Sequence, residues 1–258
     1  MSWASSRQFK YLILFVTVLV LIIFALTYNL IFKKPTCFDS KQNGTETGID
    51  CGGSCSLMCK EDTEEPVVLW SRAFPVVNNN FNLVAYVENR NKNSGVVTAN
   101  YEFRIYDSDN KLLGRRQGTT FIPPNQQFAV FQPRFDAGQS VLKSVTFEFT
   151  SPLVWVKKDT TLQTLPIYVK DILLDNNKDT PTLSATITND SIYDIQEFDV
   201  IAILYDIDHN AINASASHKD KLPNNSSIPV TFTWPEVLSA EPVTKDVLIS
   251  INPFTVDF

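Results

Sequence analysis

The chain beyond residue 60 repeats itself at an offset of about 100 residues, and this repeat most limits the folds open to it. In each copy an asparagine closes one apolar segment, a Tyr-Asp pair closes the next, and a Pro-Asn pair follows. Several matches in the same order at one offset are not expected by chance. The body is therefore predicted to hold two related domains, residues 66–155 and 163–258. The matched residues are Asn89 with Asn189, Tyr106-Asp107 with Tyr205-Asp206, and Pro124-Asn125 with Pro223-Asn224.

Both copies show the alternation of apolar and polar side chains that is typical of half-buried strands. Residues 101–105 and 145–149 alternate in the first copy and residues 183–187 in the second, where Phe198, Val200, Ala202 and Leu204 also stand at alternate positions. Clusters of Asn, Asp and Pro separate these segments, as turns do. The expected fold is all-β, with two tandem immunoglobulin-like sandwiches. No cysteine lies in either copy, so apolar packing must hold the cores; the large candidates are Trp70, Phe103, Phe131, Phe147 and Trp234.

The segment Phe103-Arg104-Ile105-Tyr106-Asp107 resembles the motif of the FxLYD domain family. The second copy, Ala202-Ile203-Leu204-Tyr205-Asp206, keeps the Tyr-Asp pair and lacks the phenylalanine. The resemblance implies a β-sandwich in an extracytoplasmic setting and brings no catalytic residue. From the residues alone, the Tyr-Asp pair is interpreted as a strand end that enters a turn.

An uncharged apolar run extends from residue 11 to residue 32. As a helix it is roughly 33 Å long at about 1.5 Å per residue, enough to cross a bilayer core of about 30 Å. A cleaved signal peptide has a shorter apolar region and small residues at its cleavage site, which this run lacks. The prediction is a transmembrane helix over residues 11–32, behind a cytoplasmic tail of residues 1–10. Positive charges flank both ends almost equally, so they do not fix the orientation.

All four cysteines fall within a predicted module of residues 35–60, at Cys37, Cys51, Cys55 and Cys59. Zinc sites usually contain C-x2-C pairs, and none occurs here. An even count in a short segment favours two disulfides, which need an oxidising compartment and so predict an N-terminus inside and a body outside. Three pairings are open, and the spacing does not choose among them.

Oxygen-bearing side chains alternate with glycines inside this module. They offer two alternatives, a calcium site or a set of turns that shapes the disulfide-bonded loops. The candidate calcium ligands are Asp39, Asn43, Glu46 and Asp50.

The same stretch resembles a Cys-rich module of bacterial surface and secreted proteins. The matching residues are Cys37, Asn43-Gly44, Glu46-Thr47, Asp50-Cys51-Gly52-Gly53 and Cys55. The spacing before Cys59 departs slightly from that pattern. The resemblance implies an exported, envelope-facing location.

Charge and motif content narrow the function classes. A net charge of −6 argues against nucleic acid as a partner. The sequence contains no phosphate-binding loop, dinucleotide fingerprint or nucleophile elbow, and both histidines, His209 and His218, stand among polar residues and are expected at the surface. The chain is therefore predicted not to be an enzyme and to need no cofactor, calcium aside.

The leading hypothesis is a single-pass envelope protein that presents its sandwiches to a protein partner for adhesion or assembly. The alternative is an extracytoplasmic sensor of calcium or a small ligand.

Overall fold

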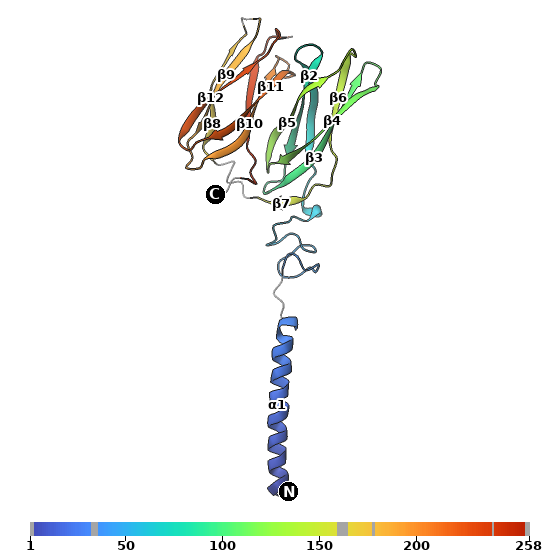
Figure 1. Ribbon diagram of the computed structural model, residues 1–258, viewed down its shortest axis with the longest axis vertical. Coiled ribbons are helices and arrows are strands. Elements are labelled where there is room, and N and C mark those ends of the chain that lie inside the picture. The colour runs from blue at the N-terminus through green and yellow to red at the C-terminus, as the bar shows by residue number, and fades with distance from the viewer. Residues whose placement is uncertain (1–2, 32–35, 159–164, 177–178, 239, 256–258) are drawn as a thin grey trace. The chain divides into compact units, whose positions relative to one another are not determined.

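The computed structural model describes residues 3–31, 36–158, 165–176, 179–238 and 240–255 (Figure 1). The chain divides into two compact units, Met1–Ser54 and Cys55–Phe258. The described residues leave out the first two residues of the predicted tail and the last three of the second predicted domain. They also leave out residues 159–164, which include most of the segment between the two predicted domains.

The first unit begins with a single helix, α1, over Trp3–Ile31. Its described side chains, from Phe9 to Phe24, are exposed and almost all apolar. Residues 11–31 of the predicted span are helical, residue 32 lies outside the described residues, and the helix begins at Trp3, inside the predicted tail. Within the part of the chain that the structure describes, no helix combines the length and the apolarity that a membrane crossing requires. Passage of α1 through a membrane therefore stays a prediction.

The second unit is built from strands in four antiparallel sheets, which pair into two sandwich-like bodies (Figure 1). The expected all-β sandwich architecture is thus confirmed. Sandwich 1 has the sheets β1-β2-β5 and β4-β3-β6, with β7 added beside β3. Its strands are β1 (Val67–Pro75), β2 (Asn80–Asn89), β3 (Ser94–Asp107), β4 (Leu112–Ile122), β5 (Gln126–Asp136), β6 (Leu142–Phe149) and β7 (Trp155–Lys157).

Sandwich 2 repeats the strand order of sandwich 1, with the sheets β8-β9-β12 and β11-β10-β13. This identity of topology agrees with the repeat in the sequence. Its strands are β8 (Ile167–Asp175), β9 (Thr182–Asn189), β10 (Ile195–Tyr205), β11 (Ala211–Leu222), β12 (Ser226–Thr233) and β13 (Thr244–Ser250).

Each sandwich has its own apolar core, formed by the inward-facing members of the alternating strands. Phe103 and Phe147 pack with their rings 4.9 Å apart in the first core, and Trp234 lies in the second. Two predicted core residues are placed differently. Trp70 and Phe131 pack in a third cluster, on the opposite face of their sheet. The prediction that they fill a sandwich core is wrong.

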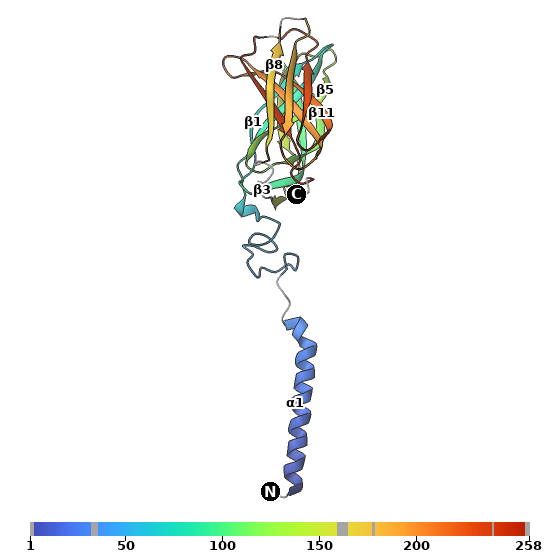
Figure 2. The same ribbon diagram turned by 90° about the vertical axis from the view of Figure 1, so that its left-hand side faces the viewer.

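The third cluster joins the two sandwiches face to face. Phe74 and Val84 of the sheet β1-β2-β5 pack with Ile201, Ile203 and Tyr205 of the sheet β11-β10-β13. In Figure 2 the yellow-to-red strands of sandwich 2 lie in front of the cyan-to-green strands of sandwich 1. A second apolar face on each inner sheet therefore stacks the two sandwiches side by side rather than end to end.

The repeat in the sequence places the same two features in each sandwich, a buried asparagine at a strand end and a turn that contains an asparagine of positive φ. Asn89 and Asn189 are both fully buried at the ends of β2 and β9. Asn125 and Asn225 both adopt positive φ, at 47° and 45°, in the turns that follow β4 and β11. Asn225, not Asn224, is therefore the counterpart of Asn125, and the sequence alignment was off by one residue here.

Residues 60–66, which connect the Cys-rich module to sandwich 1, pack against the sandwich although they are mostly polar and acidic. Residues Lys60–Asp62 form a short 3-10 helix. The next part of the segment is clamped by Asn91, whose Oδ1 accepts from the backbone N–H of Glu64 at 2.8 Å and whose Nδ2 donates to the carbonyl of Glu64 at 2.8 Å. The clamp holds the segment against sandwich 1.

Candidate functional site

The Cys-rich module is held by covalent and turn-forming interactions. All four predicted cysteines, Cys37, Cys51, Cys55 and Cys59, are disulfide-bonded. Gly44, Gly52 and Gly53 adopt positive φ, where a side chain is strained. A Cβ on Gly53 would lie 1.8 Å from the carbonyl oxygen of Thr45. The loops therefore close only with glycine at this position.

The four candidate calcium ligands lie together in the module and hydrogen-bond within it. The Asp50 carboxylate accepts from the backbone N–H groups of Asp39 and Ser40, each at 2.9 Å. Glu46 Oε2 accepts from the N–H of Asn43 at 3.0 Å, and Asn43 Nδ2 donates to Asp39 Oδ2 at 2.9 Å. These contacts are those of the turn-shaping alternative, in which carboxylates hold backbone donors. The calcium prediction stays a prediction.

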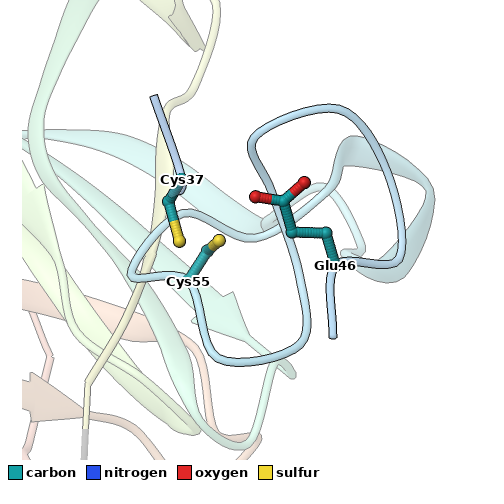
Figure 3. A group of neighbouring side chains, drawn as sticks. All are labelled: Cys37, Glu46 and Cys55. Carbon is teal, nitrogen blue, oxygen red and sulfur yellow. The ribbon is translucent and has the colours of Figure 1, made fainter. Parts of the chain in front are cut away.

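One further group of potential metal ligands lies in the same region. The Sγ atoms of Cys37 and Cys55 and a carboxylate oxygen of Glu46 lie within 4.8 Å of one another (Figure 3). A metal-binding cysteine must supply a thiolate, and a disulfide sulfur does not. With both cysteines oxidised, this group is a carboxylate beside disulfide sulfur and has no thiolate to offer a metal.

The last part of the module is an integral part of sandwich 1. Leu57 forms an antiparallel bridge with Val156 of β7. Met58 N–H donates to the carbonyl of Trp155 at 3.0 Å, and Lys157 N–H donates to the carbonyl of Ser56 at 2.7 Å. The Met58 side chain packs against the core of sandwich 1. The segment from Cys55 to Cys59 thus extends the sheet that contains β3 and β7.

Polar groups at the edge of the inter-sandwich contact fix its alignment. Arg72 Nη1 donates to the carbonyl of Ala211 at 2.8 Å, and Nη2 donates to Asn210 Oδ1 at 3.2 Å.

Burial and the neighbouring Asp246 carboxylate both raise the pKa of Tyr205 well above its usual value, and the same two causes raise the pKa of Tyr86. Both tyrosines stay neutral hydrogen-bonding groups at physiological pH.

A cleft lies beside this contact, between the two sandwiches. One cavity of about 420 Å³ is lined by Phe121 and Phe131 of sandwich 1 and by Ile201 and His218 of sandwich 2. A second, of about 270 Å³, shares Phe121 and Ile201 with it. Both apolar and polar side chains line the cleft, as they do in ligand sites between domains.

His218 and Asp199 form a cross-strand pair at the rim of this cleft. They face each other across β10 and β11, with His218 Nδ1 2.8 Å from Asp199 Oδ1. The hydrogen bond to this carboxylate raises the pKa of His218; burial opposes the shift, and the negative charges of Asp199 and its acidic neighbours add to it. Both side chains are 58% exposed, which confirms the expected surface position of this histidine.

The Tyr-Asp repeats have a structural explanation. Asp107 Oδ1 accepts from the N–H groups of Asp109 and Lys111, each at 2.9 Å. Asp206 Oδ1 makes the same contacts with Asp208 and Asn210, at 2.9 and 2.8 Å. Each aspartate thus closes a hairpin turn, as the interpretation of the sequence proposed.

The sequence reasoning missed the inter-sandwich face, although a signal was present. Residues 200–205 of β10 are apolar at every position, and residues 83–87 of β2 are too. Strict alternation predicts one buried face, whereas a continuous apolar run predicts burial on both. The alternate members of each run form the core face, and the residues between them form the second buried face.

Comparisons with known proteins give no family. No protein-family model matches the chain, and no curated protein matches it. Among solved structures, it is similar to the crystal structure of red sea bream transglutaminase, with 12% sequence identity and a TM-score of 0.23. The match covers 72% of this chain and 31% of that protein. The likeness is too low to carry an argument about function.

Proposed function

We propose that this chain is a single-pass membrane-anchored protein whose body lies outside the membrane and presents two sandwiches to a protein partner, without enzymatic activity. One observation carries the proposal: the described parts of the body contact one another as one unit. The Cys55–Cys59 segment is bridged to β7 of sandwich 1, and the two sandwiches share an apolar face. Such a body suits adhesion or assembly because its surfaces keep fixed relative positions, which lowers the entropic cost of binding.

The anchor and the orientation rest on the sequence. The uncharged run of residues 11–32 supports the anchor, together with the exposed apolar side chains of α1 between Phe9 and Phe24. The disulfide-bonded cysteines support a body in an oxidising compartment, because such bonds are rare in a reducing one. A cytoplasmic N-terminus follows from these two together.

We further infer that the sandwiches are immunoglobulin-like and related to FxLYD domains, and that the cysteine segment is of the bacterial surface type. The shared strand order of the two sandwiches supports the first inference, as does the turn-closing role of Asp107 and Asp206. The positive-φ glycines at Gly44, Gly52 and Gly53 support the second, since the motif supplies glycine at these positions.

A site-specific photo-crosslinking scan tests the proposed function. A photoreactive amino acid is placed at exposed positions over the whole surface of Cys55–Phe258, in the full chain, in membranes of a producing host. The proposal predicts a discrete protein adduct from one contiguous group of positions. No adduct from any position contradicts it, and so does a hydrolase or transferase activity that a point substitution abolishes.

A second candidate function is favoured by the cleft between the sandwiches. Its volume of about 420 Å³ lies in the range of small-molecule sites, and the exposed His218–Asp199 pair stands at its rim. This is the sensor alternative. Binding to the native state raises the melting temperature, so a thermal-shift screen with Ca²⁺ alone and with a panel of small polar metabolites tests it. A specific shift that is lost in Ala216→Trp, which fills the cleft, supports the sensor; no shift removes it.

A further inference from the structure

One end of the sandwich pair collects exposed apolar side chains on its loops. Consecutive strands run antiparallel, so the described residues of six connections lie at the end opposite β7 (Figure 1): β1–β2, β3–β4, β5–β6, β8–β9, β10–β11 and β12–β13. We call this the loop end. Its exposed aliphatic side chains, between 41% and 73% accessible, are Val77, Val141, Ile207, Val237 and Val243. Single exposed aliphatic residues are ordinary, but a group of them on neighbouring loops marks an interaction surface.

Hydrogen bonds connect the loops of sandwich 1 at this end. Asn79 Nδ2 donates to the carbonyls of Gly138 and Ser140, at 2.9 and 3.0 Å, and so ties the β1–β2 loop to the β5–β6 loop. Lys143 Nζ donates to the carbonyl of Ser108 at 3.3 Å, which ties β6 to the β3–β4 loop. Val77 and Val141 therefore stand on connected loops.

The loops of sandwich 2 are connected in the same way. The N–H of Val243 donates to the carbonyl of Tyr205 at 2.8 Å, two residues before Ile207. The bond from Arg72 to Asn210 joins this group to sandwich 1. The loops that carry Val77, Val141, Ile207 and Val243 are therefore connected within and between the sandwiches, which reduces the ordering cost of docking.

The charges around these apolar side chains are predominantly negative. Among the described residues, the basic side chains at the loop end are Lys111, Lys143 and Lys245. The acidic ones are Asp107, Asp109, Asp136, Asp175, Asp179, Asp206, Asp208, Glu236 and Glu241. An acidic surface with apolar contacts repels a second copy of itself and an anionic lipid surface, and attracts a basic surface.

We propose that the loop end is the docking surface of this protein, and that its occupant is a partner protein with a basic surface that contains apolar contact sites. The proposal rests on the proposed function and adds to it the face and the chemistry of the partner. Apolar contacts from Ile207 and Val141 supply affinity, and the surrounding carboxylates supply the attraction that speeds association.

The chain offers a matched control for this test. Ile192 lies at the opposite end of sandwich 2, in the loop between β9 and β10, and is 73% exposed, as Ile207 is. Serine at either position removes the same apolar surface from an exposed loop. The two variants differ only in the end of the molecule that they alter.

The probe is a fluorescent peptide of alternating lysine and leucine, titrated by anisotropy against the full chain in a neutral detergent. Saturable binding is expected. Ile207→Ser should weaken it at least threefold and the double variant Val141→Ser/Ile207→Ser at least tenfold, with Ile192→Ser unchanged within twofold. A lysine–serine peptide should bind more weakly, and a glutamate–leucine peptide should not bind. Equal losses in Ile207→Ser and Ile192→Ser, or no loss in the double variant, overturn the proposal.

Two further outcomes identify a different occupant or a different failure. If Ile207→Ser converts a dimer to a monomer in sedimentation equilibrium, the occupant is a second copy and the proposal is wrong. In the photo-crosslinking scan, adducts from position 207 and not from position 192 support the loop end. Adducts from position 192 alone overturn this inference and leave the proposed function standing, whereas no adduct anywhere removes the proposed function itself.

Discussion

The side chain of Asn89 donates from Nδ2 to the carbonyl of Pro123 at 2.7 Å and so binds the end of β2 to the turn between β4 and β5. Asn189 makes the equivalent bond to Pro223 at 3.1 Å in the second sandwich. Both asparagine side chains are buried. Asn89 Oδ1 accepts from the backbone N–H of Asn91, and Asn189 Oδ1 accepts from the backbone N–H of Ser191. One buried side chain thus satisfies backbone groups from two connections that are far apart in sequence.

Replacing Asn89 should lower the free energy of unfolding. Asn89→Ala leaves the carbonyls of Ser94 and Pro123 without their buried donor, so we expect a loss of about 2–4 kcal/mol in unfolding free energy. Urea denaturation measures it, with the exposed Lys92→Ala as a control that should stay within about 0.5 kcal/mol. A loss as small as that of the control contradicts the fastening role of Asn89.

The Cys-rich module should fail if Gly53 gains a side chain. Gly53→Ala places a Cβ against the carbonyl of Thr45, so the loop cannot close and the cysteines cannot pair. Gly138→Ala is a matched control, because Gly138 also has a positive φ, of 61°, but has open space around it. Intact mass after alkylation without reductant should reveal free thiols in Gly53→Ala alone. Fully paired cysteines in that variant count against this account of the module.

The contact between the sandwiches should contribute measurably to stability. Ile203 is fully buried in it, and Ile203→Ala should cost about 2–4 kcal/mol by loss of burial and creation of a cavity. Ile207→Ala, at an exposed position near the end of the same hairpin, should change stability by less than about 0.5 kcal/mol. If denaturation curves of the two variants coincide, the sandwiches do not depend on each other as described.

The His218–Asp199 pair should add a small pH-dependent stability. The folded-state pKa of His218 is raised, so the contribution is complete below the unfolded value of about 6.5 and is lost as the pH rises through the folded value. Since both partners are exposed, we expect it to stay below about 1 kcal/mol. Asp199→Asn should lower the His218 pKa in an NMR titration. An unchanged titration curve would show that Asp199 is not the cause.

The sequence was sufficient for features that are local in the chain. Alternation with a period of two is a property of five or six consecutive residues, so strands such as residues 101–105 were predictable. The turn function of Asp107 was also predictable, because its hydrogen bonds reach only to Asp109 and Lys111. The cysteines were recognisable from their number and clustering.

Features that depend on contacts between distant segments were not predicted. Trp70 and Phe131 are apolar members of alternating strands, and alternation does not say which of two apolar faces meets the core. The hydrogen bonds of Asn91 to Glu64 join the segment before β1 to the turn between β2 and β3, and no local sequence pattern predicts them. The loop end emerges only when six connections from two sandwiches are placed at one end of the fold.

The topology of the full chain is the most direct test of the central claim. Intact cells that produce it are treated with a membrane-impermeant reductant and then with an impermeant maleimide, and the extracted protein is weighed by mass spectrometry. The account predicts that all four cysteines, Cys37, Cys51, Cys55 and Cys59, are labelled after reduction and none without it. Labelling without reductant, or only after the cells are lysed, contradicts a disulfide-bonded body that stands outside the membrane.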